Sequence, residues 1–241
     1  MLAIKNLTKH YKGSNKGVTD ISLTIEAGDI YAFIGHNGAG KTTTLKSVAG
    51  IHGFDEGEIL INGISIKENS LLCKRQFAYI PDNPDLYEYL TGIQYLNFIA
   101  DVFEVSVVDR EKRIQKYADD FGITESLGDL ISSYSHGMKQ KLAIISALVH
   151  KPKLLILDEP FVGLDPKATV VLKNIMRELC EAGGAIFFST HVLDVAEKLC
   201  NKVAIIKDGV LIKEGKMDEI VKSGESLESI FMEVASDDKA D

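Results

Sequence analysis

A glycine-rich stretch has the composition and spacing of a phosphate-binding loop. The residues that fit the pattern G-x-x-x-x-G-K-[ST] are Gly35, His36, Asn37, Gly38, Ala39, Gly40, Lys41 and Thr42. An apolar run over 30–34 precedes them and a helical pattern starts at Lys41, which is the context in which this pattern is informative. Glycines let backbone N–H groups point inward at phosphates, and a helix N-terminus adds partial positive charge. The stretch predicts a nucleoside triphosphate site, with a bare glycine-rich turn as the alternative.

Three residues at the end of this loop have separate expected roles. Lys41 is expected to reach the β- and γ-phosphates and to take part in catalysis. Thr42 offers a hydroxyl to Mg²⁺, which prefers a few oxygen ligands and keeps several waters. Thr43, the next residue of the predicted helix, is included among the nucleotide contacts.

A second apolar strand, Leu154 to Leu157, leads directly into the carboxylates Asp158 and Glu159. Ligand sites in open α/β sheets lie at the carboxyl ends of strands. Asp158 is expected to hold Mg²⁺ directly or through water, and Glu159 to polarise the attacking water as a general base. Two solvated acids in a turn are the alternative.

A histidine follows a third apolar strand. His191 comes after Ala185 to Thr190, and one helix fits between Glu159 and this strand. From spacing alone, a structural histidine and a catalytic one are equally compatible with the sequence.

These candidates are positioned by a mixed α/β pattern. Short apolar runs of strand length alternate with helical patterns, which predicts sheets covered by helices. The expected strands, besides those already named, are Leu2 to Leu7, Ile21 to Ile25, Phe77 to Ile80 and Val203 to Ile206. Asp208-Gly209 then predicts a tight hairpin turn between two extended segments.

The middle of the chain lacks strand signals. Between about Asp85 and Val149 the pattern is helical, as in Val108 to Tyr117, where charges fall on one face. We therefore expect a single domain over 1–241, with an ATP-binding core at about 1–84 and 150–215 and a helical subdomain at about 85–149. A C-terminal helical segment and tail would occupy about 216–241, with the polar residues Ser236 to Asp241 frayed.

Composition excludes several classes of protein. The 241 residues are 45% hydrophobic and 26% charged, which is ordinary globular usage. The net charge of −8 provides no global positive field for nucleic acid or anionic lipid. No apolar run reaches the length of a membrane span, and the N-terminus lacks a secretory signal pattern. The three cysteines, Cys73, Cys180 and Cys200, are too far apart for a zinc site and are expected to be reduced and buried.

Taken together, these residues resemble the ATP-binding subunit of an ABC transporter over about Leu2 to Gly215. The phosphate loop, the strand with Asp158 and Glu159, the turn 163–166 and Thr190-His191 occur in the order that the family uses. The most diagnostic segment, 134–141, looks like a variant of the family's L-S-G-G-Q signature. Physically it is a helix N-terminus capped by Ser135, with Leu142, Ile145 and Leu148 or Val149 as a buried stripe.

The resemblance implies the architecture and the assembly. It implies a P-loop core with a small N-terminal antiparallel region and a helical insertion. It also implies a head-to-tail dimer in which ATP at Lys41 of one subunit is covered by Ser135, His136 and Gly137 of the other. The second subunit would be an identical copy or a paralogue.

The resemblance also assigns several side chains. Tyr11, in the loop from Lys9 to Val18, matches the position that stacks on adenine, and an ordinary loop tyrosine is the alternative. Val18 at the end of that loop is included among the nucleotide contacts. Asp165 matches the position that links the two sites across the dimer, and His191 the one that holds the γ-phosphate and Glu159 in register.

Two residues depart from the family pattern. Asp82 stands where a glutamine that touches Mg²⁺ is usual, and it is expected either to bind the metal or only to cap a turn beside Pro81 and Pro84. His136 replaces the first signature glycine, and its ring is expected to turn away from the nucleotide.

The resulting functional expectation is an ATPase that drives export through separate transmembrane permease subunits. ATP and Mg²⁺ are the expected cofactors, nucleic acid is not an expected partner, and the chain would meet the cytoplasmic face of the membrane only through the permease. Bacterial exporter cassettes for drugs, antimicrobial or amphipathic peptides, or lipids are the most similar. The alternatives are a soluble cassette protein that remodels nucleic acid or ribosomes, and a regulatory module that binds ATP without turnover.

Overall fold

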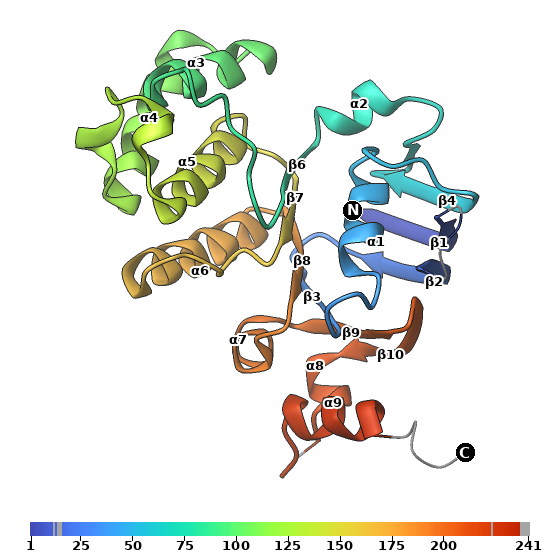
Figure 1. Cartoon of the computed structure of the whole chain (residues 1–241). Coiled ribbons are helices and arrows are strands. Elements are labelled where there is room, and N and C mark those ends of the chain that lie inside the picture. Colours follow the sequence, from blue (N-terminus) through green and yellow to red (C-terminus); the bar gives the residue numbers. More distant parts are fainter. Residues whose placement is uncertain (12, 14–15, 223, 237–241) are drawn as a thin grey trace.

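Two β-sheets and the helices around them make up the chain (Figure 1). The structure is a computed structural model that describes residues 1–11, 13, 16–222 and 224–236. Its strands are β1 (Leu2–His10), β2 (Gly17–Ile25), β3 (Ile30–Ile34), β4 (Glu56–Ile61), β5 (Ile64–Ser65), β6 (Phe77–Ile80), β7 (Leu154–Asp158), β8 (Ala185–Thr190), β9 (Lys202–Lys207) and β10 (Val210–Lys216). Its α-helices are α1 (Lys41–Val48), α2 (Ser70–Lys74), α3 (Gly92–Val102), α4 (Val107–Phe121), α5 (His136–Val149), α6 (Pro166–Glu181), α7 (Leu193–Leu199), α8 (Met217–Ile220) and α9 (Leu227–Ser236).

The larger sheet has the strand order β10-β9-β3-β8-β7-β6. Its strands from β9 to β6 are parallel, and β3, β7 and β8 are buried along their whole length, as apolar runs covered on both faces should be. Ile34 pairs with Thr190, and Asp158 pairs with Ser189, so these three strands end at one edge. The residues that follow them, Gly35, Glu159 and His191, therefore emerge side by side.

The smaller sheet is antiparallel, with the order β2-β1-β4-β5. Helix α1 lies between it and the parallel sheet (Figure 1), and Leu45 of α1 belongs to the same buried cluster as Leu23 and Phe33. The predicted loop from Lys9 to Val18 is shorter than expected, because β1 continues to His10 and β2 begins at Gly17. Cross-strand pairs such as His10 with Gly17 extend the ladder into that segment.

Helices α3, α4 and α5 form a group on the side opposite the antiparallel sheet (Figure 1). Thr91 and Gln94 form a capping box at the start of α3, and Ser106 caps α4. Ser135 caps α5, whose residues Leu142 to Val149 are all buried. The helical segment predicted over 85–149 is confirmed. Its status as a separate subdomain stays a prediction.

The C-terminal part begins with the predicted hairpin. Asp208 and Gly209 both have positive φ and connect the antiparallel strands β9 and β10. The Gly209 carbonyl accepts a hydrogen bond from Thr19 N–H at 2.8 Å, and Gly209 N–H donates to the Ala39 carbonyl at 3.0 Å. One residue of the turn is thus bonded both to the antiparallel sheet and to the phosphate loop.

Other expectations concern single residues and the tail. Cys73, Cys180 and Cys200 are free and buried, as predicted. Of the segment predicted to fray, Ser236 ends α9, and residues 237–241 lie outside the described part of the chain. Within that part, no helix combines the length and apolarity that crossing a bilayer requires.

Candidate nucleotide site

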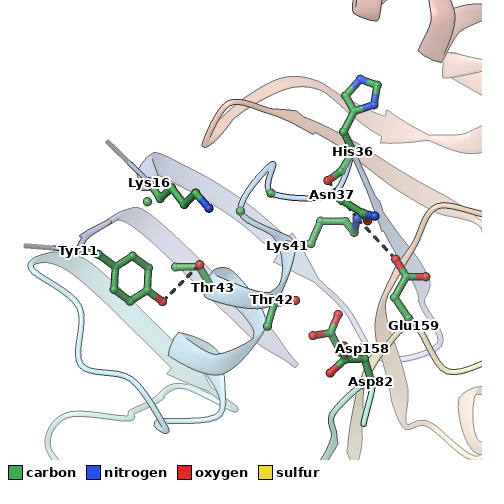
Figure 2. Close-up of a pocket in the computed structure, with 13 residues that line it drawn as sticks. Tyr11, Lys16, His36, Asn37, Lys41, Thr42, Thr43, Asp82, Asp158 and Glu159 are labelled. Carbon is green, nitrogen blue, oxygen red and sulfur yellow. Dashed lines mark hydrogen bonds and ion pairs between the residues drawn. The ribbon is translucent and has the colours of Figure 1, made fainter. Parts of the chain in front are cut away.

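A cavity of about 280 Å³ opens at the carboxyl edge of the parallel sheet. Figure 2 shows Lys41 and Thr42 of the phosphate loop facing Asp158 and Glu159 across it. The described residues that line it are Tyr11, Lys16, Gly17, His36, Asn37, Gly38, Gly40, Lys41, Thr42, Thr43, Asp82, Asp158 and Glu159. Three separate strand ends and one loop of the other sheet therefore contribute to a single concave site.

The phosphate loop requires glycine at two positions because of close packing behind it. A Cβ on Gly40 would lie 2.5 Å from Cγ1 of Val18, and the φ of Gly40 is +108°. A Cβ on Gly35 would lie 2.5 Å from the carbonyl oxygen of Ile206. Val18 is fully buried, so its side chain supports the loop from behind and does not line the cavity. Nucleotide contact by Val18 stays a prediction.

Lys41 lies inside the loop with only 6% of its surface exposed. Its ammonium group donates hydrogen bonds to the carbonyl oxygens of Gly35 at 2.7 Å and His36 at 3.3 Å. Its Nζ is also 3.5 Å from Oε1 of Glu159. The loop backbone thus orients a buried cation toward Glu159, and Figure 2 shows this ion pair across the cavity.

Asp158 is buried at the end of β7, with 1% of its surface exposed. Its Oδ1 accepts a hydrogen bond from Ser189 Oγ at 2.5 Å, and its Oδ2 has no protein partner among the described residues. Burial raises the pKa of Asp158, while the hydrogen bond from Ser189 and the nearby Thr42 hydroxyl act in the opposite direction. An orphaned carboxylate oxygen beside the Thr42 hydroxyl is a donor set that suits a hard cation such as Mg²⁺.

Glu159 follows directly and is held on both sides. Its backbone has a φ of +48°, an unusual conformation for a residue with a side chain, and its N–H donates to Ser189 Oγ at 3.0 Å. Its Oε2 lies 2.9 Å from Nδ1 of His191 and accepts a hydrogen bond from the His191 N–H at 3.3 Å. The turn of the backbone thus directs adjacent acids to different partners: Asp158 to the β8 strand, and Glu159 to Lys41 and His191.

Tyr11 forms the far wall of the cavity. Its hydroxyl lies 3.4 Å from Oγ1 of Thr43, and its ring makes an edge contact with His52 at a centroid separation of 6.2 Å. Lys16 lines the same wall, and the sequence analysis did not identify it. The sequence feature that could have identified Lys16 is its positive charge in the same short β1–β2 connection as Tyr11.

The position of Asp82 is compatible with both of its expected roles. It lines the cavity beside Asp158, and its charge contributes to the raised pKa of that residue. Its Oδ1 also accepts a hydrogen bond from the N–H of Asn83 at 2.9 Å, as a turn-capping side chain would. Metal binding by Asp82 stays a prediction.

The segment 135–137 lies apart from this cavity, and none of its residues is among the described ones that line it. The Ser135 hydroxyl accepts a hydrogen bond from Met138 N–H at 3.3 Å, and a Cβ on Gly137 would lie 2.7 Å from the Gly163 carbonyl oxygen. The His136 ring occupies the space next to Gly163, where an added Cβ would lie 2.6 Å from its Cδ2. A side chain at position 163 would therefore displace this ring.

Asp165 connects the same segment to α6. Its Oδ1 caps the helix by accepting a hydrogen bond from Ala168 N–H at 2.8 Å, and its Oδ2 pairs with Nζ of Lys141 at 2.6 Å. The Lys141 and Ala168 hydrogen bonds hold the pKa of Asp165 below its usual value. Helices α5 and α6 are thus joined by an ion pair at their N-terminal ends.

A comparison with known protein families shows which family this chain belongs to. The family described as "ABC transporter" matches residues 18–162, which include the phosphate loop, the segment 135–137 and both carboxylates. The chain belongs to the ABC transporter family. It is a nucleotide-binding subunit and an ATPase of that family.

Individual relatives agree with this assignment. The chain is 34% identical to the ABC-type transporter ATP-binding protein EcsA of Bacillus subtilis, over 99% of this chain and 98% of that protein. It is 32% identical to the linearmycin resistance ATP-binding protein LnrL of the same organism, over 91% of this chain and 70% of that protein. A solved ATP-binding subunit of an ABC transporter superposes with a TM-score of 0.92 at 35% identity, over 98% of this chain and 99% of that one.

For an ABC nucleotide-binding subunit, the structure brings together most of the predicted site. The phosphate loop, Asp158, Glu159 and His191 converge at one sheet edge, and Tyr11 and Asp82 lie at the cavity wall. Within this one chain the structure does not bring the segment 135–137 or Asp165 to the cavity.

Proposed function

We propose that this chain binds Mg·ATP between two cassettes and uses its hydrolysis to drive export through separate transmembrane subunits. The observation that carries this proposal is the division of the site. One chain presents a phosphate loop with an ion-paired Lys41 and Glu159, whereas its Ser135-capped helix N-terminus lies elsewhere. Free N–H groups at a helix N-terminus bind anions, so a second copy or paralogue that contributes Ser135 and Gly137 would complete the triphosphate site.

The proposed roles of the residues follow from their contacts. Lys41 neutralises charge on the β- and γ-phosphates, and the loop N–H groups orient them. Glu159 accepts a proton from the attacking water, while His191, 2.9 Å away, holds this carboxylate in place. Mg²⁺, when bound, stabilises the negative charge of the phosphates, and Thr42 and Asp158 would hold it, with Asp82 as a further ligand.

Transmembrane subunits would dock on an apolar groove next to the nucleotide cavity. We call this cavity of about 350 Å³ the β6–α3 groove; the described residues that line it are Ala49, Ile51, Lys74, Phe77, Ala78, Tyr79, Ile80, Pro81, Pro84, Asp85, Leu86, Tyr95, Ile99, Phe103, Ala143, Ser146, Ala147 and His150. Pro81 lies next to Asp82, which lines the nucleotide cavity. A helix of a transmembrane subunit bound in this groove would contact Pro81, the residue before Asp82. Asp82 lies at the end of the nucleotide cavity where the γ-phosphate would bind.

The proposed direction and cargo rest on similarity. The relative LnrL is a linearmycin resistance protein, which supports export of an amphipathic compound such as a drug, an antimicrobial peptide or a lipid. We place the chain at the cytoplasmic face of the membrane, bound there through its permease.

The test is a resistance assay in cells that express this chain together with a candidate transmembrane subunit. Cells with the wild-type chain should tolerate higher concentrations of at least one amphipathic antibiotic or peptide than cells with Glu159→Gln. Equal tolerance across the panel, together with ATP-dependent uptake of a solute into those cells, would contradict export and leave the ATPase assignment intact.

A further inference from the structure

The C-terminal helix α9 has an apolar face that packs onto the rest of the chain. Leu227, Ile230, Phe231 and Val234 follow the i, i+3, i+4, i+7 spacing of one helix face. Leu227 and Ile230 are buried in the main core cluster, and Phe231 and Val234 pack against it. Met232, on the other face, is 61% exposed. The helix is therefore docked through a defined stripe.

Two polar contacts fix this helix at its two ends. The Leu227 N–H donates to Oε2 of Glu197 in α7 at 2.7 Å. Nζ of Lys207 at the end of β9 donates to the Val234 carbonyl oxygen at 2.9 Å. Glu197 lies in a cavity with Asp29 and Lys202, at the starts of β3 and β9, whereas Lys207 lies at the end of β9. Helix α9 therefore runs along the sheet toward its nucleotide edge.

The stripe also reaches the phosphate loop. The Phe231 ring lies 4.8 Å from the His36 ring, centroid to centroid, with the planes at 50°. Figure 2 shows the His36 ring directed away from Lys41 and Glu159. The His36 carbonyl oxygen, in contrast, faces the site: it accepts hydrogen bonds from Lys41 Nζ at 3.3 Å and Ala39 N–H at 3.1 Å. His36 thus contacts α9 through its ring and the phosphate loop through its carbonyl oxygen.

We propose that Phe231 is a positioning residue for ATP binding. Its ring restrains His36 from outside the cavity, and this restraint keeps the backbone of the phosphate loop, and Lys41 with it, in the conformation that receives phosphates. Helix α9 lies beyond residues 18–162, the part of the chain that matches the family, so the support comes from a segment outside that match. The inference rests on the nucleotide site described above and extends it to the C-terminus.

The first test is Phe231→Ala in the full chain, with Met232→Ala as the control from the exposed face. Binding of a fluorescent ATP analogue without Mg²⁺ should weaken by about two- to tenfold in Phe231→Ala, the range expected for loss of one aromatic pair. Steady-state ATPase assays should show a raised KM with kcat retained, because the reacting groups Glu159 and His191 are unchanged. Met232→Ala should match the wild type in both assays.

A double-mutant cycle separates positioning from general stability. In a His36→Ala background, Phe231→Ala should cause no further loss of ATP affinity, because the restraint acts through the His36 ring. Phe231→Leu keeps apolar volume in the core and removes the ring contact, so it tests the same point if the alanine variant does not fold. It should bind ATP more weakly than the wild type, with a melting temperature close to it.

Three outcomes would overturn the inference. Phe231→Leu could bind ATP as tightly as the wild type, the losses from His36→Ala and Phe231→Ala could be additive, or kcat could fall with KM unchanged. If the wild-type chain binds ATP normally in these experiments, the assignment of the nucleotide site stands even when the role of Phe231 is overturned. A wild-type chain that binds no ATP would overturn the nucleotide site and this support together.

Discussion

The nucleotide cavity and the β6–α3 groove lie on either side of the segment Pro81-Asp82. They differ in the charge and pairing of their buried polar side chains. In the cavity, Lys41 and Glu159 lie 3.5 Å apart and carry opposite charges. In the groove, the His150 ring stacks on Phe103 with centroids 3.7 Å apart, and its Nδ1 has no partner among the described residues. Burial lowers the pKa of His150 to about 4, and nearby Arg113 adds to this effect.

This difference indicates what each surface is built to receive. A concave site that presents charged side chains suits a charged ligand, because charges interact more strongly there than in bulk water. A neutral imidazole among aromatic and aliphatic side chains suits an apolar partner, which removes water without stranding a charge. The first region therefore suits a nucleotide, and the second suits the proposed docking of a transmembrane subunit.

The largest effect is expected at Glu159, the proposed general base of the cavity. Glu159→Gln should preserve ATP binding and lower turnover by about 10²- to 10⁴-fold, because the amide keeps the shape but cannot accept a proton. Light scattering should show an ATP-bound dimer. The matched control is Glu104→Gln, whose side chain is 70% exposed. Turnover of Glu159→Gln within about tenfold of wild type, against the loss that a missing general base causes, would show that another group is the base.

A comparable loss is expected when the cation of the cavity is removed. Lys41→Ala should weaken ATP binding by about 30-fold or more, the usual effect of removing one partner of a buried charge pair. ATPase activity should disappear with it, and the melting curve without nucleotide should stay near that of wild type. Unchanged affinity and turnover in the folded variant would contradict the phosphate-loop assignment.

The groove is expected to respond to acid rather than to nucleotide. His150 titrates near 6.5 in the unfolded chain and at about 4 in the folded one, so the unfolded chain binds more protons between these values. The free energy of unfolding should therefore fall as pH drops, by about 2 kcal/mol from pH 7 to pH 5. His150→Phe, which keeps a ring against Phe103, should remove about that much of the acid loss in urea titrations. An equal loss in both proteins would show that other groups cause it.

The smallest effect is expected at Asp82, between the two regions. Asp82→Asn should raise the Mg²⁺ concentration for half-maximal ATPase activity by about fivefold, because one unit charge contributes about 1 kcal/mol at 4 Å in a solvated site. Metal-free ATP binding should be equal or tighter, since repulsion with the phosphates is removed. Coincident magnesium midpoints for the two proteins would show that Asp82 only caps its turn.

The sequence predicted the cavity better than the elements that flank it. The phosphate loop and Asp158-Glu159 are contiguous motifs in a strand context, so both could be identified locally. The hairpin of β4 and β5 was not predicted, although Asn62-Gly63 between two apolar segments is a signal for it.

Contacts between distant segments could not be predicted from local pattern. The packing of His136 against Gly163 and of His36 against Phe231 depends on how helices pack, and no spacing rule encodes it. The structure places the His136 ring next to Gly163, and its orientation relative to the nucleotide stays a prediction. This close packing appears only in three dimensions.

The Gly209 turn holds the antiparallel sheet and the phosphate loop, which lie on two sides of the nucleotide cavity, at a set separation. Since Gly209 is bonded to Thr19 of the antiparallel sheet and to Ala39 of the phosphate loop, the two sheets keep a constant separation at this point. The strand β1, which ends next to Tyr11, pairs directly with β2, which contains Thr19. The distance between Tyr11 and Lys41 across the cavity is therefore set by these contacts. If the base of a nucleotide lies against Tyr11, as the sequence predicts, its phosphate chain must be long enough to reach Lys41 in the same cavity.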